Sequence, residues 1–171
     1  MTECIKDMSR VTSTGRVPKW ASYAACTWAF VFATLSFYWA LGGTIGLSTI
    51  SPAIEDLASA PWGGAMLWGT GILKVLAGLL ALALVQPWGR SLPRRLLVIA
   101  TWGVGGFMVL YEGVANLMVR VVMALGLIPT PASMYSPTAY WHLVLWVPWW
   151  MLGGFLFCLA AWHAQRRSNL L

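Results

Sequence analysis

The stretch GAMLWGTGILKVLAGLLALALV at residues 64–85 decides the fold, because its only charge is Lys74 and its other residues are apolar or small. A helix of about 20 such residues crosses the ~30 Å hydrocarbon core of a bilayer. In water, the same helix would need to be buried on all sides. A chain of 171 residues leaves little interior for that, so the stretch predicts a transmembrane helix.

Three more stretches have the same character, at residues 20–43, 96–118 and 140–162. The whole chain is 59% hydrophobic and 9% charged, whereas soluble domains carry about 25% charged residues. We therefore predict an all-α integral membrane protein, a compact antiparallel up-down-up-down four-helix bundle. This transmembrane domain should occupy residues 19–165, between short tails at 1–18 and 166–171.

The basic residues indicate how the spans are oriented. The chain holds 11 Lys and Arg and has a net charge of +6. Most of them lie before the first span, between the second and third, or after the fourth: Lys6, Arg10, Arg16, Lys19, Arg90, Arg94, Arg95, Arg166 and Arg167. Because cytoplasmic loops are enriched in Lys and Arg, we expect both termini in the cytoplasm and a multi-pass protein of the plasma (cell) membrane. The basic residues form no continuous stripe, so we expect the lipid bilayer, and not nucleic acid, as the partner.

Several classes of functional site are excluded by the motifs that the sequence lacks. The cysteines Cys4, Cys26 and Cys158 form no C-x-x-C pair, which argues against thiol–disulfide chemistry and a cysteine zinc site. The chain has no glycine-rich phosphate loop, no H-E-x-x-H and no G-x-S-x-G. His142 and His163 lie at opposite ends of the fourth span. We therefore expect no metal and no cofactor.

Ionisable residues within a membrane span are costly, and each is a functional hypothesis by default. Lys74 lies near the middle of the second span, and Glu112 lies in the outer half of the third. Neither side chain would tolerate contact with lipid in its charged form. The simplest expectation is that both face the interior and form an ion pair with each other.

Other polar residues lie at a similar depth to Glu112. Asn116 and Arg120 follow it at i+4 and i+8, so the three share one face of a helix. Tyr38 lies near the outer end of the first span, and His142 begins the fourth. We expect a polar pocket open to the outer face, formed by Tyr38, Lys74, Glu112, Asn116 and His142. The catalytic candidates are Glu112, Tyr38 and His142, and the ligand-binding candidates are Lys74, Glu112, Asn116, Trp146 and Trp149.

The indole pair Trp146 and Trp149 belongs to a group of tryptophans around Pro148. Proline removes a backbone hydrogen bond, so the fourth span should kink there. Two interpretations remain open: a cavity for a flat apolar ligand, or ordinary packing of indole rings.

Three functions fit these features. The leading hypothesis is a protein that binds or moves a small lipophilic molecule, in resistance or export. The first alternative is an intramembrane enzyme of the isomerase or cyclase type, acting on a lipid or isoprenoid with Glu112 as general acid. The second is an accessory subunit of a larger membrane complex, with glycine-rich helix faces packing on a membrane-protein partner. Self-association into a homo-oligomer is compatible with each of them.

Three segments carry a resemblance to a known family: YWALGG at residues 38–43, WGRSLPRR at 88–95 and WVPWWMLGGFLF at 146–157. With them, residues 20–167 resemble a family of small bacterial four-helix membrane proteins known only as a domain of unknown function. The resemblance implies the four-span fold. It implies no activity, because the family has no established reaction.

Overall fold

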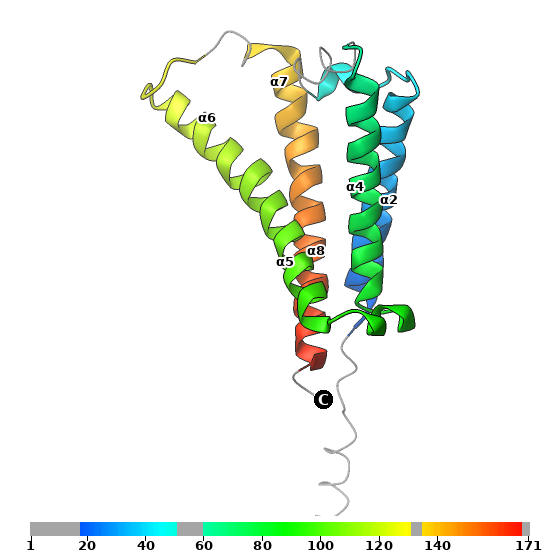
Figure 1. Cartoon of the computed structure of the whole chain (residues 1–171). Helices are drawn as coiled ribbons and strands as arrows, with labels where there is room; N and C mark the ends of the chain where they lie inside the picture. Colours follow the sequence, from blue (N-terminus) through cyan, green and yellow to red (C-terminus); the bar gives the residue numbers. More distant parts are fainter. Residues whose placement is uncertain (1–17, 51–59, 131–134, 169–171) are drawn as a thin grey trace, which may run out of the picture.

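The structure, a computed structural model, describes residues 18–50, 60–130 and 135–168. Within these ranges the chain forms helices and turns and no strand. Four helices of the described part are long and apolar enough to cross a membrane: Trp20–Ala40, Gly63–Ala83, Arg94–Ala124 and Pro137–Arg167 (Figure 1). The prediction of an all-helical protein with four apolar spans is therefore confirmed.

Some helices begin or end at residues other than the predicted ones, near glycines with a positive φ or at a capping serine. The first helix, α2 (Trp20–Ala40), ends before the predicted residue 43, because Gly42 adopts a φ of +93° that favours glycine. The third span continues past the predicted residue 118 to Ala124, and Gly126 follows with a φ of +71°. The fourth begins at Pro137, where the Ser136 hydroxyl accepts a hydrogen bond from the Ala139 amide at 3.2 Å.

Two of the spans contain a π-helical segment. The third consists of α5 (Arg94–Met108), the π segment η3 (Val109–Ala115) and α6 (Asn116–Ala124). The fourth consists of α7 (Pro137–Trp141), the π segment η5 (His142–Trp146) and α8 (Val147–Ser168). Segment η5 ends two residues before Pro148, which cannot donate a backbone hydrogen bond. Such π segments are rare and occur frequently at functional sites.

Glycines allow the helices to approach closely. In α4 (Gly63–Ala83), a Cβ added at Gly71 would lie 2.6 Å from the ring of Phe37 in α2. Where α5 crosses α8, a Cβ at Gly105 would lie 2.8 Å from the carbonyl oxygen of Gly154. Likewise, a Cβ at Gly153 would lie 2.5 Å from the indole of Trp28. The molecule is therefore two helical hairpins, α2–α4 and α5–α8, joined where α2 packs on α8.

The expected compact bundle is open on one side. Beyond the Gly105–Gly154 crossing, the third span leans away from the fourth, as Figure 1 shows. None of the residues of α6, all of which the structure describes, is buried. The packing is thus tight around the glycine contacts and loose around α6.

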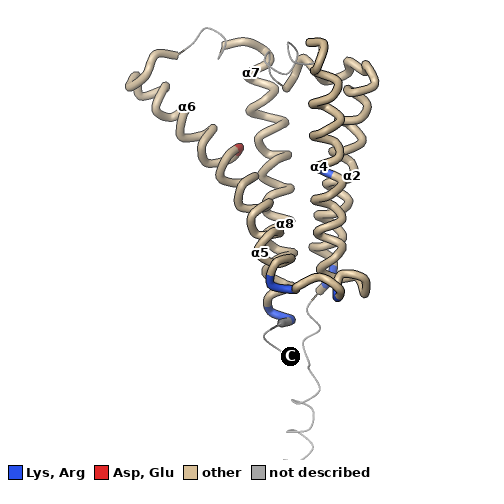
Figure 2. The backbone as a smooth tube through the Cα atoms, in the orientation of Figure 1, with Lys and Arg blue, Asp and Glu red and all other residues tan. Residues whose placement is uncertain are grey.

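The described basic residues at the helix ends gather at one end of the molecule (Figure 2). There Arg167 Nη2 donates a hydrogen bond to the carbonyl oxygen of Pro18 at 2.8 Å, and Arg94 Nη2 donates to that of Ala164 at 3.0 Å. These contacts bring the start of α2, the start of α5 and the end of α8 together. We call this the basic end and the opposite one the far end.

Candidate functional site

Glu112 and His142 form an ion-pair contact in the far half of the molecule. His142 Nε2 lies 3.4 Å from Glu112 Oε2, and the two side chains are only 17% and 14% exposed. Glu112 belongs to η3 and His142 to η5, so the contact joins the two π segments. The two places where the helices depart from α geometry are therefore the two that position this pair.

The hydrogen bonds of His142 determine how many protons the pair holds. The other ring nitrogen, Nδ1, lies 2.7 Å from the carbonyl oxygen of Ile50. A carbonyl oxygen only accepts hydrogen bonds, so Nδ1 must carry a proton. A hydrogen bond across the 3.4 Å contact then needs one more proton, on Nε2 or on Glu112, and the pair has no net charge when it holds that one proton.

Asn116 and Arg120 continue the same helix face toward the far end. Asn116 Nδ2 donates to Glu112 Oε2 at 3.3 Å, so this oxygen contacts both neighbours. Arg120 Nη2 donates to the carbonyl oxygen of Ala139 in α7 at 3.4 Å. The structure thus brings together Glu112, Asn116 and His142, as the sequence suggests, and adds Arg120 beside them.

Trp146 and Trp149, the two indoles predicted to bind a ligand, lie in an aromatic cluster between α2 and the fourth span. Trp146 is buried, and its Nε1 donates to the hydroxyl of Thr49 at 3.1 Å. The Trp149 ring lies 5.6 Å from that of Trp28, whose Nε1 donates to the Trp149 carbonyl oxygen at 3.1 Å. These contacts of Trp146 and Trp149 are packing and hydrogen bonds within the protein, and the role of the two indoles in binding a ligand stays a prediction.

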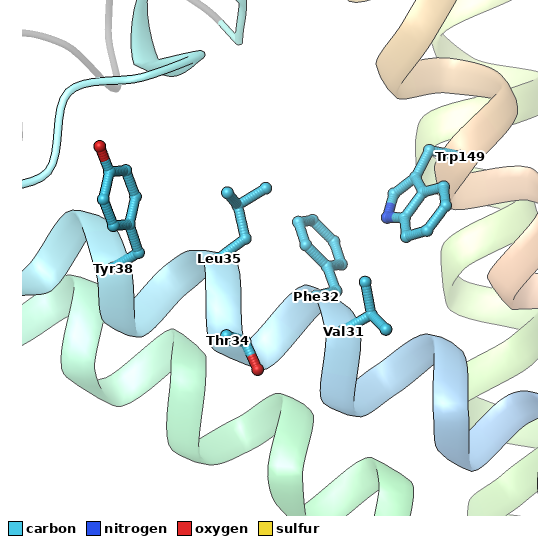
Figure 3. A pocket seen from close by; sticks show the side chains of 6 residues that line it. All are labelled: Val31, Phe32, Thr34, Leu35, Tyr38 and Trp149. Carbon is cyan, nitrogen blue, oxygen red and sulfur yellow. The ribbon is translucent and has the colours of Figure 1, made fainter.

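A groove of about 360 Å³ borders this cluster. Its lining comes from α2 and α8 and is almost entirely apolar (Figure 3): Val31, Phe32, Thr34, Leu35, Tyr38 and Trp149. Three of the α2 residues, Val31, Leu35 and Tyr38, follow at i, i+4 and i+7 and so form one stripe. The groove is therefore a second candidate site, separate from the Glu112–His142 pair.

Tyr38 lines this groove and does not hydrogen-bond to Glu112 or His142 among the residues that the structure describes. Its hydroxyl oxygen accepts a hydrogen bond from the backbone amide of Ile45 at 3.4 Å. A similar depth in the membrane does not make two residues neighbours, because the rotation of each helix decides where a side chain lies. That Tyr38 converges with Glu112 on one pocket therefore stays a prediction.

Lys74 is also not paired with Glu112. Lys74 Nζ donates to the hydroxyl of Ser36 at 2.8 Å and lies 4.2 Å from the centre of the Phe32 ring. Among the described residues, one carboxylate forms an ion pair: Glu112, which pairs with His142. The expected Lys74–Glu112 ion pair is therefore absent, and a hydroxyl and an aromatic ring hold the ammonium group instead.

Residues 29–157 match a family described as a protein of unknown function, DUF3995. The chain belongs to this family. The expected membership of a family of unknown function is thus confirmed, and the match includes Lys74, the Glu112–His142 pair and the groove. No curated protein and no solved structure matches the chain. The function must therefore be argued from the geometry of these residues.

Several site residues have no signal in the sequence. Ser36 and Thr49 are ordinary hydroxyl residues, and Ile50 takes part only through its backbone carbonyl. The groove could have been found from the stripe that Val31 and Leu35 form on the first span. An apolar stripe in a membrane span usually contacts lipid, however, so the pattern alone does not separate a groove from a lipid-facing surface.

Replacing Lys74 with methionine should stabilise the protein by about 1 kcal/mol, measured as reversible unfolding in mixed micelles. A lysine at the centre of a membrane helix costs about 2.5–3.5 kcal/mol. One hydrogen bond and two ring contacts, with Phe32 at 4.2 Å and Trp150 at 6.0 Å, return only part of that. The control is Ser36→Ala, which removes the acceptor but leaves the ammonium group, and should destabilise the protein by about 1–2 kcal/mol. A loss of stability in Lys74→Met as large as that in Ser36→Ala would contradict this prediction.

Proposed function

We propose that the protein is a multi-pass protein of a bacterial plasma membrane that binds or moves a small lipophilic molecule. Its spans run up-down-up-down, with both termini in the cytoplasm and the far end outside. The gathering of basic residues at one end supports this orientation, because Lys and Arg are retained on the cytoplasmic side. The contact of Arg167 with Pro18 supports it too, since it joins the first and last helices at that end.

The observation that carries the proposal is the groove between α2 and α8. Its volume of about 360 Å³ falls within the range of small-molecule sites, about 300–1,000 Å³. Five of its six lining side chains carry mainly apolar surface, and Thr34 and the Tyr38 hydroxyl are the polar groups. Such a lining suits a molecule with hydrocarbon or aromatic surface and few polar atoms. Because four spans are few for a transporter acting alone, transport would require a homo-oligomer or a membrane-protein partner.

Native mass spectrometry of protein extracted gently from its own membrane tests this proposal. The wild-type protein should carry a discrete small molecule. Leu35→Trp, which fills the groove with a larger ring, should lose it. Leu79→Trp is the matched control, because Leu79 is 40% exposed on α4 and does not line the groove. A wild-type protein without ligand, or the same ligand in Leu35→Trp, would refute the groove as its binding site.

A second candidate function is an intramembrane enzyme acting on a lipid or isoprenoid. The Glu112–His142 contact favours it, because a single proton held between a carboxyl and an imidazole group in a water-poor setting is suited to general acid catalysis. In this reading Glu112 donates the shared proton to the substrate and takes back the proton that the substrate releases as the product forms, while His142 holds the carboxyl group in place. Glu112→Gln distinguishes the two functions, and its expected results are given in the Discussion.

A further inference from the structure

Arg120 is a charged side chain whose hydrogen-bonding capacity is largely unused. Among the described residues, its Nη2 has the 3.4 Å contact with the Ala139 carbonyl oxygen, while its Nε is buried and has no hydrogen-bond partner. A guanidinium group has five N–H donors and keeps its charge at any physiological pH. A buried charged donor without a partner is costly, so the site favours a further group that accepts hydrogen bonds.

Among the residues that the structure describes, no carboxylate forms an ion pair with Arg120. Glu112 lies two turns away on the same helix face, but its Oε2 is held by His142 and Asn116. A Glu112 carboxylate that faces a protonated His142 has no net charge as a pair. The cluster of Glu112, Asn116, Arg120 and His142 is therefore left with the single positive charge of Arg120. An anion neutralises that charge, whereas a cation would be repelled.

We propose that Arg120 binds the anionic group, phosphate or carboxylate, of a ligand at the far end of the molecule. The planar guanidinium group can donate two parallel hydrogen bonds to either anion. The exposed apolar side chains of α6, such as Leu117 and Val121, lie beside it and suit the hydrocarbon tail of an amphiphile. The proposal rests on the membrane orientation of the proposed function, but not on the groove, since Arg120 does not line it.

Photo-crosslinking of the full chain in a neutral detergent tests this site. The probe is a phosphatidylglycerol with a diazirine next to its headgroup, and the matched control probe is a diacylglycerol with the same diazirine. We expect the anionic probe to label peptides from α6 and α7. Labelling there should fall about tenfold or more in Arg120→Gln, because a charge-assisted hydrogen bond is lost, and less in Arg120→Lys, which keeps the charge.

Arg95→Gln is the control variant, because Arg95 is exposed at the basic end and should not affect labelling of α6. An unchanged melting temperature in Arg120→Gln would show that lost labelling is not caused by lost folding.

Inorganic phosphate and oleate serve as competitors in the labelling experiment. Competition by oleate alone would assign the site to an amphiphile headgroup, and competition by phosphate would assign it to a free anion. Equal labelling by the diacylglycerol probe, or labelling unchanged in both Arg120 variants, would overturn the proposal, whatever the outcome for Leu35→Trp.

Discussion

Replacing Gly105 with leucine should destabilise the protein by about 3 kcal/mol, one of the two largest effects on stability that we expect from a single substitution. A Cβ at Gly105 would lie 2.7 Å from Cys158 Sγ and 2.8 Å from the Gly154 carbonyl oxygen. The carbonyl belongs to the backbone of α8, so it can move away only if the two helices separate. Reversible unfolding in mixed micelles, followed by tryptophan fluorescence, measures the change.

The neighbouring Gly106 provides the control for this prediction. A Cβ added there meets no atom within 4 Å. Gly106→Leu should therefore leave stability unchanged or raise it by up to about 1 kcal/mol, because leucine favours a helix more than glycine does. Similar losses in both variants would show that α5 and α8 do not cross at Gly105. If Gly106→Leu stays stable but loses a co-purifying membrane protein, the accessory-subunit hypothesis gains support.

Replacing Glu112 with leucine should cost about 3 kcal/mol, because it leaves buried polar groups without their partner. His142 Nε2 and Asn116 Nδ2 both contact Glu112 Oε2. Glu112→Gln keeps an oxygen acceptor in the same place, so it should cost less than about 1 kcal/mol. Adding His142→Leu to Glu112→Leu should recover only part of the loss, since it removes the unpaired imidazole but leaves Asn116 Nδ2 and the Ile50 carbonyl oxygen without their partners. Additive losses in the double variant would mean that the pair does not exist.

The same glutamine variant separates the two candidate functions. Glutamine cannot donate a proton as an acid does, so an enzyme with Glu112 as general acid should lose turnover by about 100-fold or more while still binding its lipid. The readout is the composition of the lipophilic molecules that co-purify with each variant. A binding protein should carry the same molecule in both. If the protein is an enzyme, the wild-type protein should co-purify with product, and the Glu112→Gln variant should co-purify with substrate alone.

The four helices could be predicted because a membrane span needs about 20 consecutive apolar residues, and such stretches are visible in the sequence. Glu112 and Asn116 were also predictable neighbours, since i and i+4 residues share a face. The partner of Lys74 was not, because opposite charge and similar depth do not specify how two helices are rotated about their axes. The π segments add to this difficulty, since they widen the turn and shift the positions of later residues. Pro148 gives a reason to expect η5, but no residue of η3 gives a comparable signal.

The division into two hairpins has a consequence for how the chain enters the bilayer during synthesis. Lys74 and its acceptor Ser36 both lie in the hairpin that is made first. Glu112 and His142 both lie in the second, as do Arg120 and the Ala139 carbonyl oxygen. Each hairpin therefore carries partners for its own intramembrane charges when it leaves the ribosome. Insertion can then proceed hairpin by hairpin, without a charge waiting in lipid for a helix not yet made.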